Sequence, residues 1–291
     1  MIKTVLVTGA TGKVGRRVIP RLARRGMTVR AASRSPRVSL HSIDSVRFDW
    51  TDASTYQPAV AGVDAIYLVP GPVPQADHAD KIRSLLDVAG GGGVRRAVLL
   101  SSFGVGQAPP ENPLRRIELA VEASGVPYTI LRPVAFMENF SEGLRWRESF
   151  AVGIRERDEI VGPGGKGIVS YVSADDIAAV AAIALTEDGH SGKAYAPLGP
   201  EPLTLAQVAE QISWVTGRKI KYVETDRTPI RDALLASGAP PETAEHNSQV
   251  YTHAFSSGMF GVVNDDILNV IGRPPLSFGE FAAGAVAAWR R

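Results

Sequence analysis

Three glycines near the amino terminus carry the clearest chemical signal in this 291-residue chain. Gly9, Gly12 and Gly15 are spaced three residues apart and directly follow the short apolar run Thr4–Val7. A glycine turn between a buried strand and a helix lets a pyrophosphate approach the backbone, because no Cβ stands in its way. Gly9 would permit the tight turn, and Gly15 would let the helix pack closely on the strand. We therefore predict a dinucleotide-binding turn formed by Gly9, Thr11, Gly12, Lys13, Val14 and Gly15, with the helix N-terminus facing the anion.

The next predicted strand, residues 28–32, leads to Ser33 and Arg34 rather than to a carboxylate. In folds of this kind that bind NAD, an Asp or Glu at this point accepts hydrogen bonds from the adenosine ribose. The guanidinium of Arg34 can instead bind a 2′-phosphate through two N–H groups. The sequence thus favours NADP(H) over NAD(H). The alternative is that Arg34 is one more solvated arginine in an arginine-rich region.

Further candidate residues follow the four strands predicted between residues 45 and 131. Ligands of open α/β sheets lie outside the carboxyl ends of the strands. Asp49 and Trp50 follow the first of these strands, where a loop closes over an adenine. We expect the other strand ends to line the cofactor as well, through Val69, Pro70, Gly71, Ser101, Ser102 and Pro133.

The elements that must position these residues alternate regularly between strand and helix. Six predicted strands alternating with helical segments indicate an α/β fold with a doubly wound parallel Rossmann sheet. After Pro133 the pattern changes to large apolar and aromatic residues, which indicates a smaller C-terminal α/β substrate lobe. We assign residues 1–133 and about 168–190 to the NADP-binding Rossmann domain, and about 134–167 and 191–291 to the substrate lobe.

Several of these segments resemble the NmrA-like family of the atypical short-chain dehydrogenase/reductase superfamily. The resemblance implies a Rossmann fold that binds NADP(H) on the glycine turn and Arg34. It also implies NAD(P)H-dependent reduction of quinones, dyes or isoflavone-type molecules, with the segment after Arg132 and Pro133 bordering nicotinamide and substrate. Other members of the family are redox-sensing regulators. The matching segments are VTGATGKVG at 7–15, LLSS at 99–102, IELAVEASGVPYTILRP at 117–133, FMENF at 136–140, VSADDIAAVAAIAL at 172–185 and GRPPLSFGEFA at 272–282.

The resemblance weakens at the position of the general acid. Related reductases carry a Tyr and a Lys four residues apart at the start of the helix after the fifth strand, or a Lys or His alone. In this sequence Pro110 and Leu114 occupy those places, and neither side chain can donate a proton. We therefore predict that no Tyr–Lys acid is present. The candidates that remain are Ser102 and Tyr171, followed by His190 and His253, for which a structural role is the alternative.

A group of large apolar side chains follows the fifth and sixth predicted strands. These side chains could form the wall of a pocket for a planar substrate. The alternative is that they belong to the hydrophobic core of the second lobe, and the sequence favours neither. The residues are Phe103, Phe136, Met137, Phe140 and Trp146.

Together these observations predict an NADPH-dependent oxidoreductase that transfers hydride to a planar conjugated small molecule of the quinone, dye, imine or enone type. Such electrophilic acceptors need placement beside the nicotinamide more than they need a strong protein acid, and solvent could supply the proton. Two alternatives remain open. One is a regulatory protein that senses NADP(H), and the other is a non-redox enzyme such as a cyclase or dehydratase.

The composition limits which partners and which cellular location we expect for this protein. The net charge is +2 and the arginines are dispersed, so we expect no direct binding of nucleic acid. Residues 177–185, the longest apolar helical stretch, are too short to cross a bilayer of about 30 Å, so we expect no membrane association. The absence of cysteine excludes disulfides and thiolate metal sites and fits a cytoplasmic location. We predict no metal site and a small-molecule substrate, with a homodimer or a protein partner left open.

Overall fold

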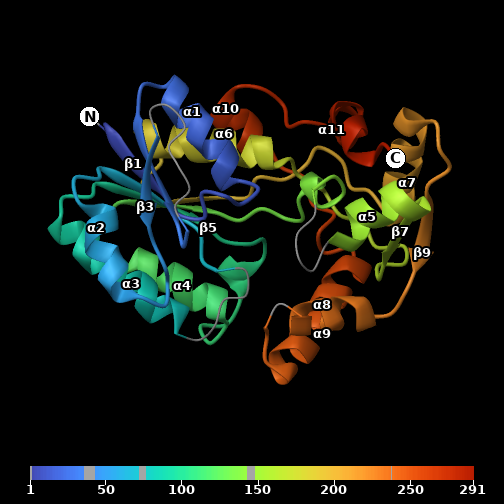
Figure 1. The fold of residues 1–291 in the computed structure, drawn as a ribbon, viewed down its shortest axis with the longest axis horizontal. Helices are drawn as coiled ribbons and strands as arrows, with labels where there is room; N and C mark the ends of the chain where they lie inside the picture. The colour runs from blue at the N-terminus through green and yellow to red at the C-terminus, as the bar shows by residue number, and fades with distance from the viewer. Residues whose placement is uncertain (1, 36–42, 72–76, 143–147, 237) are drawn as a thin grey trace. The chain divides into compact units, whose positions relative to one another are not determined.

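The computed structural model describes residues 2–35, 43–71, 77–142, 148–236 and 238–291 (Figure 1). The chain divides into two compact units. The first unit comprises Met1–Pro133, Ala174–Pro197 and Asn269–Gly272. The second comprises Val134–Ser173, Leu198–Leu268 and Arg273–Arg291.

The first unit is built on a seven-stranded sheet in which every pair of neighbouring strands is parallel. This confirms the predicted doubly wound Rossmann sheet. All four residues of the central strand β4 are buried, as expected for a parallel strand covered on both faces. In spatial order the strands are β3 (Ile43–Arg47), β2 (Thr28–Ser33), β1 (Thr4–Val7), β4 (Ala65–Leu68), β5 (Arg96–Leu100), β6 (Tyr128–Leu131) and β8 (Lys193–Tyr195).

The seventh strand, β8, corrects the predicted assignment of residues 191–291 to the smaller lobe. β8 pairs in parallel with β6, with Leu131 opposite Tyr195. It therefore extends the Rossmann sheet by one edge strand. Edge strands are short and partly exposed, so this one carries little of the apolar pattern by which a central strand is recognised.

Helices cover both faces of the sheet in the first unit. In Figure 1, α1 and α6 lie above the sheet, and α2, α3 and α4 lie below it. Arg17 and Arg21 of α1 both pair with Asp175 of α6, at 3.2 Å and 2.6 Å, and so join the two upper helices. The bounds are α1 (Gly15–Arg24), α2 (Tyr56–Val60), α3 (His78–Gly91), α4 (Pro113–Glu122) and α6 (Ala174–Thr186), while α10 (Asp266–Ile271) contributes residues to both units.

The second unit contains a two-stranded parallel sheet and a separate hydrophobic core. Trp289 is fully buried in this core, and its indole N–H donates to the carbonyl of Phe140 at 2.7 Å. α7 begins with a capping box formed by Thr204 and Gln207. The strands are β7 (Glu159–Gly162) and β9 (Lys221–Glu224), and the helices are α5 (Glu148–Arg157), α7 (Leu205–Thr216), α8 (Thr228–Ala236), α9 (Pro241–Ser256) and α11 (Phe278–Ala285). Among the described residues, no helix combines the length and the apolar character needed to span a bilayer.

Asp64 fastens the amino-terminal strand to the turn before β4. Its Oδ2 accepts hydrogen bonds from the backbone N–H groups of Lys3 (2.7 Å) and Thr4 (3.0 Å), and its Oδ1 pairs with Arg95 at 2.7 Å. These partners lower the pKa of Asp64 from 3.8 to about 2, and the hydrogen bond from the Thr4 N–H has the largest effect on this pKa.

This lowered pKa predicts a loss of stability in acid. A carboxyl group whose pKa is lower in the folded than in the unfolded state stabilises the fold fully at pH values above its unfolded pKa. This stabilisation is lost as the pH falls towards the folded pKa. We expect native protein to be more stable than Asp64→Asn at neutral pH, and the difference to shrink between about pH 4 and pH 2. Urea unfolding at several pH values measures it, and a difference independent of pH in this range would contradict the assignment.

Candidate functional site

The glycine turn lies at the point where the chain reverses its direction across the sheet. From β1 the chain proceeds to β2 and β3 on one side, and it then crosses to β4 on the other side of β1. Ligands of doubly wound sheets bind at such a switch point. The Thr8 hydroxyl joins the two diverging strands, because it donates to the Tyr67 carbonyl at 2.9 Å and accepts from the Val69 N–H at 2.8 Å.

The first and third glycines of the turn are required by close approaches of the backbone. Gly9 has a φ of +60°, and a Cβ at this position would lie 3.0 Å from the Cβ of Val69. A Cβ on Gly15 would lie 2.2 Å from the Gly9 carbonyl oxygen. The tight turn predicted for Gly9 and the close packing predicted for Gly15 are therefore both present. A Cβ on Gly12 would approach the same oxygen to 3.1 Å, which is tight but less severe.

The amino end of α1 retains its positive dipole. The helix has no side-chain cap at Val14 and no acidic residue in its first turn. An anion at this position would therefore meet backbone N–H groups and no carboxylate from the first turn of the helix itself. Lys13 is buried in the turn, whereas Thr11 is exposed. The fold thus places all six predicted residues of the turn at the switch point, and their contacts with a cofactor stay a prediction.

The ends of β2 and β3 lie side by side and bring Arg34 near Asp49. Ser33 accepts a hydrogen bond from the Phe48 N–H at 2.9 Å. Hydrogen bonds from Thr51 lower the pKa of Asp49, and the positive charge of Arg34 lowers it further. The Arg34 side chain is exposed and makes no ion pair with any residue that the structure describes. Its guanidinium is therefore available to a ligand at this edge of the sheet.

Trp50 closes the adjoining part of the edge with its side chain. Its indole N–H donates to the Val69 carbonyl at 3.2 Å, which links the end of β3 to the end of β4. The Tyr56 hydroxyl donates to the Trp50 carbonyl at 3.0 Å, so that carbonyl is already engaged. The ring also packs edge-on against Phe48, with centroids 4.8 Å apart. A contact of this segment with adenine, predicted for Asp49 and the Trp50 backbone, stays a prediction.

The segment after β4 brings in a histidine that sequence reasoning missed. Pro70 is buried and Gly71 is half-buried at the end of the strand. His78, the first residue of α3, lies over Gly71, since a Cβ there would meet the His78 Nε2 at 3.2 Å. The sequence offered no signal for this proximity.

A buried carboxylate organises the ends of β5 and β6, and it too was missed. The Glu118 side chain is 0% exposed. Its Oε1 accepts from the Ser101 hydroxyl (2.6 Å) and Arg132 Nε (2.9 Å), and its Oε2 accepts from Arg132 Nη2 (2.8 Å) and Arg115 Nη1 (2.9 Å). These bonds fill the roughly four acceptor positions of a carboxylate. Burial raises the pKa of Glu118, but the hydrogen bonds from Arg132, Ser101 and Arg115 outweigh it and hold the pKa below its usual value.

This network determines which hydrogen bonds the residues at the ends of β5 and β6 can make with a ligand. The Ser101 hydroxyl donates its hydrogen bond to the ionised carboxylate of Glu118, so it can only accept a hydrogen bond from a ligand. The Arg132 guanidinium lies against Gly106, where a Cβ would be 2.4 Å from its Nη1. The Phe103 N–H donates to the Pro133 carbonyl at 2.9 Å, which joins the two strand ends directly. The signal in the sequence is an acidic and a basic residue, Glu118 and Arg132, 14 residues apart within the segment 117–133.

The candidates for a proton donor lie in different surroundings. Ser102 is half-buried at the end of β5, on the cofactor edge. Tyr171 is 2% exposed within the core of the second unit, with its ring 5.2 Å from that of Phe140. His190 precedes β8 in the chain, and its Nδ1 lies 2.8 Å from the Tyr195 hydroxyl. His253 lies on α9 in the second unit.

The apolar residues considered for a substrate wall also separate into groups. Met137 and Phe140 are 0% exposed and belong to the core of the second unit. Of the two alternatives, the hydrophobic core is therefore the correct one for these two residues. Phe103 in the first unit and Phe136 in the second are half-buried. Trp146 lies outside the described residues.

Comparison with known proteins identifies the family. A family model described as NAD(P)H-binding matches residues 9–188, which include the glycine turn and the strands β2 to β6. The chain belongs to this NAD(P)H-binding family. A solved NmrA structure shares the fold, with a TM-score of 0.74 at 18% identity, covering 99% of this chain and 97% of that one.

Relatives of this NAD(P)H-binding protein match it over nearly its whole length. The NAD(P)H azoreductase of Xenophilus azovorans is 32% identical over 98% of this chain and 99% of its own. The (4-alkanoyl-5-oxo-2,5-dihydrofuran-3-yl)methyl phosphate reductase of Streptomyces griseus is 35% identical over 96% of both chains. The structure of Citrobacter triphenylmethane reductase complexed with NADP(H) superposes with a TM-score of 0.76, at 25% identity, covering 97% of this chain and 99% of that one. The protein is an NAD(P)H-dependent oxidoreductase, as predicted.

Proposed function

We propose that this oxidoreductase uses NADPH to reduce a planar, conjugated small molecule, with azo dyes and quinones as the substrate classes to test first. The observation that carries the proposal is the backbone contact between Gly15 and Gly9 at the switch point, which leaves the amino end of α1 open to a pyrophosphate. Full-length similarity to an NAD(P)H azoreductase supports the choice of substrate class.

Each part of the carboxyl edge has a role in this proposal. The turn from Gly9 to Gly15 and the amino end of α1 bind the pyrophosphate. Arg34 binds the 2′-phosphate, and the ends of β5 and β6 border the nicotinamide. When bound, the reduced nicotinamide supplies a hydride.

The chain's own residues explain why an electrophilic acceptor suits this site. α4 contains neither Tyr nor Lys, and its first turn is capped by Asn112, which accepts from the Leu114 and Arg115 N–H groups. The Ser101 hydroxyl donates its hydrogen bond to Glu118, so its proton is not directed at a substrate. Azo and quinone groups accept a hydride without prior protonation by a strong acid, and water then supplies the proton.

Incubation of the purified protein with NADPH and a panel of azo dyes, quinones and triphenylmethane dyes tests the proposal. We expect protein-dependent loss of NADPH absorbance together with loss of the acceptor. Tight NADPH binding without turnover of any acceptor would favour a sensing protein. Product formation with no net change in NADPH would favour a non-redox enzyme.

Replacing Arg34 by glutamate tests the preference for NADPH. We expect NADPH binding to weaken by roughly 1.5–3 kcal/mol, or about ten- to 150-fold in Kd, because a charged hydrogen bond to the 2′-phosphate is lost and repulsion is added. NADH binding should change little. Calorimetric titration of both cofactors measures the effect, and Arg24→Glu, an exposed arginine of α1 without an ion pair among the described residues, is the matched control. Equal losses of affinity for NADPH and NADH would show that Arg34 does not bind the 2′-phosphate.

A further inference from the structure

The guanidinium of Arg132 lies at the cofactor edge of the first unit, and one of its nitrogens has no acceptor among the described residues. Arg132 directly follows β6, and its backbone N–H donates to the Tyr195 carbonyl at 2.7 Å, which fixes it between the ends of β6 and β8. One edge of the planar group, formed by Nε and Nη2, donates to Glu118 at 2.9 Å and 2.8 Å. The N–H groups of Nη1 therefore point away from this carboxylate.

Gly106 covers one face of this guanidinium and leaves its outer edge open. A Cβ at Gly106 would lie 2.4 Å from Nη1, 2.5 Å from Cζ and 2.8 Å from Nη2 of Arg132. These nearly equal distances place Gly106 over the plane of the group, whereas the N–H bonds lie in that plane. The Arg132 side chain is 23% exposed, while the Glu118 side chain is 0% exposed. A buried anion thus holds the guanidinium in place, and Nη1 stays open to a ligand.

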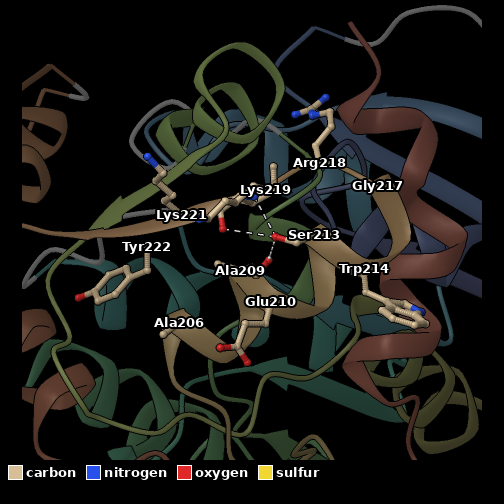
Figure 2. A pocket seen from close by; sticks show the side chains of 11 residues that line it. Ala206, Ala209, Glu210, Ser213, Trp214, Gly217, Arg218, Lys219, Lys221 and Tyr222 are labelled. Carbon is tan, nitrogen blue, oxygen red and sulfur yellow. Dashed lines mark hydrogen bonds between the residues drawn. The ribbon is translucent and has the colours of Figure 1, made fainter.

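Arg218 in the second unit provides a contrast, because its guanidinium is fully engaged. It lines a shallow depression of about 890 Å³ between α7 and β9 (Figure 2). Its Nε donates to Asp158 at 2.7 Å, its Nη1 donates to the Trp289 carbonyl at 2.6 Å, and its Nη2 donates to the Ile154 carbonyl. All three nitrogens of Arg218 therefore hold the second unit together. Arg132 has the same rigidity but keeps one donor for another molecule.

The proposed reaction creates a negative charge, and α4 offers no acid where related reductases carry one. Hydride transfer adds two electrons and one hydrogen nucleus to a quinone. The quinone becomes a hydroquinone monoanion while NADPH becomes NADP⁺, and water then protonates the oxygen. A fixed donor aimed at the atom that becomes negative lowers the barrier to such a step. A guanidinium suits this role, because it donates hydrogen bonds and keeps its positive charge.

We propose that Arg132 is a catalytic residue whose Nη1 stabilises the substrate oxygen on which negative charge accumulates. The inference rests on the proposed function, which places the ends of β5 and β6 beside the nicotinamide. It narrows the substrate class to neutral or anionic acceptors that become more negative on reduction, such as quinones. Cationic triphenylmethane dyes lose a positive charge in the same step, so the charge of Arg132 opposes their binding and does not assist their reduction.

Steady-state kinetics with a neutral quinone and a cationic triphenylmethane dye test this role. In Arg132→Gln we expect kcat for the quinone to fall roughly 100-fold, the loss typical of one removed oxyanion donor. The rate with the dye should stay the same or rise, whereas general damage to the site would lower both rates. Arg132→Lys should recover part of the quinone rate, because it keeps the charge. Gly106→Ala should also lower the quinone rate, since the new Cβ displaces the guanidinium.

Arg115→Gln is the matched control for damage to the ion-pair network. Arg115 binds the same carboxylate of Glu118, but its guanidinium also pairs with Glu122, so this variant should leave the ratio of the quinone rate to the dye rate unchanged. Binding of 4-nitrophenol gives a readout that needs no turnover. Native protein saturated with NADP⁺ should shift bound 4-nitrophenol towards its coloured anion, and Arg132→Gln should not.

Two negative results have different consequences. A native protein that reduces no acceptor contradicts the proposed function. Turnover with the same quinone-to-dye ratio in native protein and in Arg132→Gln overturns the role of Arg132 and leaves the proposed function intact. If Arg132→Gln does not fold, Gly106→Ala and the titration of native protein with 4-nitrophenol decide. An unshifted 4-nitrophenol spectrum in native protein overturns the proposal.

Discussion

Gly15→Ala should abolish NADPH binding at concentrations that saturate the native protein. The added Cβ would lie 2.2 Å from the Gly9 carbonyl oxygen and 2.9 Å from its carbon, well inside van der Waals contact. These neighbours are backbone atoms, so the turn or the helix must shift by about 1 Å. Such a displacement of binding groups costs on the order of 100-fold. Calorimetric titration with NADPH measures the loss.

A graded series separates this effect from general damage. Gly12→Ala places its Cβ 3.1 Å from the same oxygen and should have a smaller effect. Gly91→Ala, at the last position of α3 with no atom within 4 Å of the new Cβ, should leave binding unchanged. Native-like NADPH affinity in a folded Gly15→Ala protein would remove the turn from the cofactor site.

Glu118→Ala should destabilise the first unit by about 3–5 kcal/mol, the cost of removing one partner of a buried ion pair. Arg132 would lose both of its hydrogen bonds to this carboxylate, and Arg115 and Ser101 would lose one each. Because the same bonds hold the ends of β5 and β6, we expect cofactor turnover to fall in protein that remains folded. Urea unfolding followed by circular dichroism measures the stability.

The matched control is Glu122→Ala, one turn further along α4. Glu122 is 27% exposed and pairs only with Arg115 among the described residues, so its removal should cost under about 1 kcal/mol. Glu118→Gln keeps the shape but loses the charge and should fall between the two. Similar stabilities for Glu118→Ala and Glu122→Ala would show that the buried network does not support the sheet.

The sequence alone predicted the cofactor turn and the class of fold. The glycine spacing, the apolar run before it and the helical pattern after it are short-range features, and each reflects a local backbone requirement. Two further features are equally local: position 34 carries arginine instead of a carboxylate, and α4 contains neither Tyr nor Lys. These features need no knowledge of distant contacts.

Only the tertiary structure decided where the weakly patterned and the charged residues belong. β8 is a short, exposed edge strand, and only its pairing with β6 places it in the Rossmann sheet. Met137 and Phe140 have the same apolar character in a core as in a substrate wall, so burial alone distinguishes the two. Glu118 becomes an organising group because the fold surrounds it with Arg132, Arg115 and Ser101. Local patterns determine elements, whereas partners far apart in the chain are determined by how those elements pack.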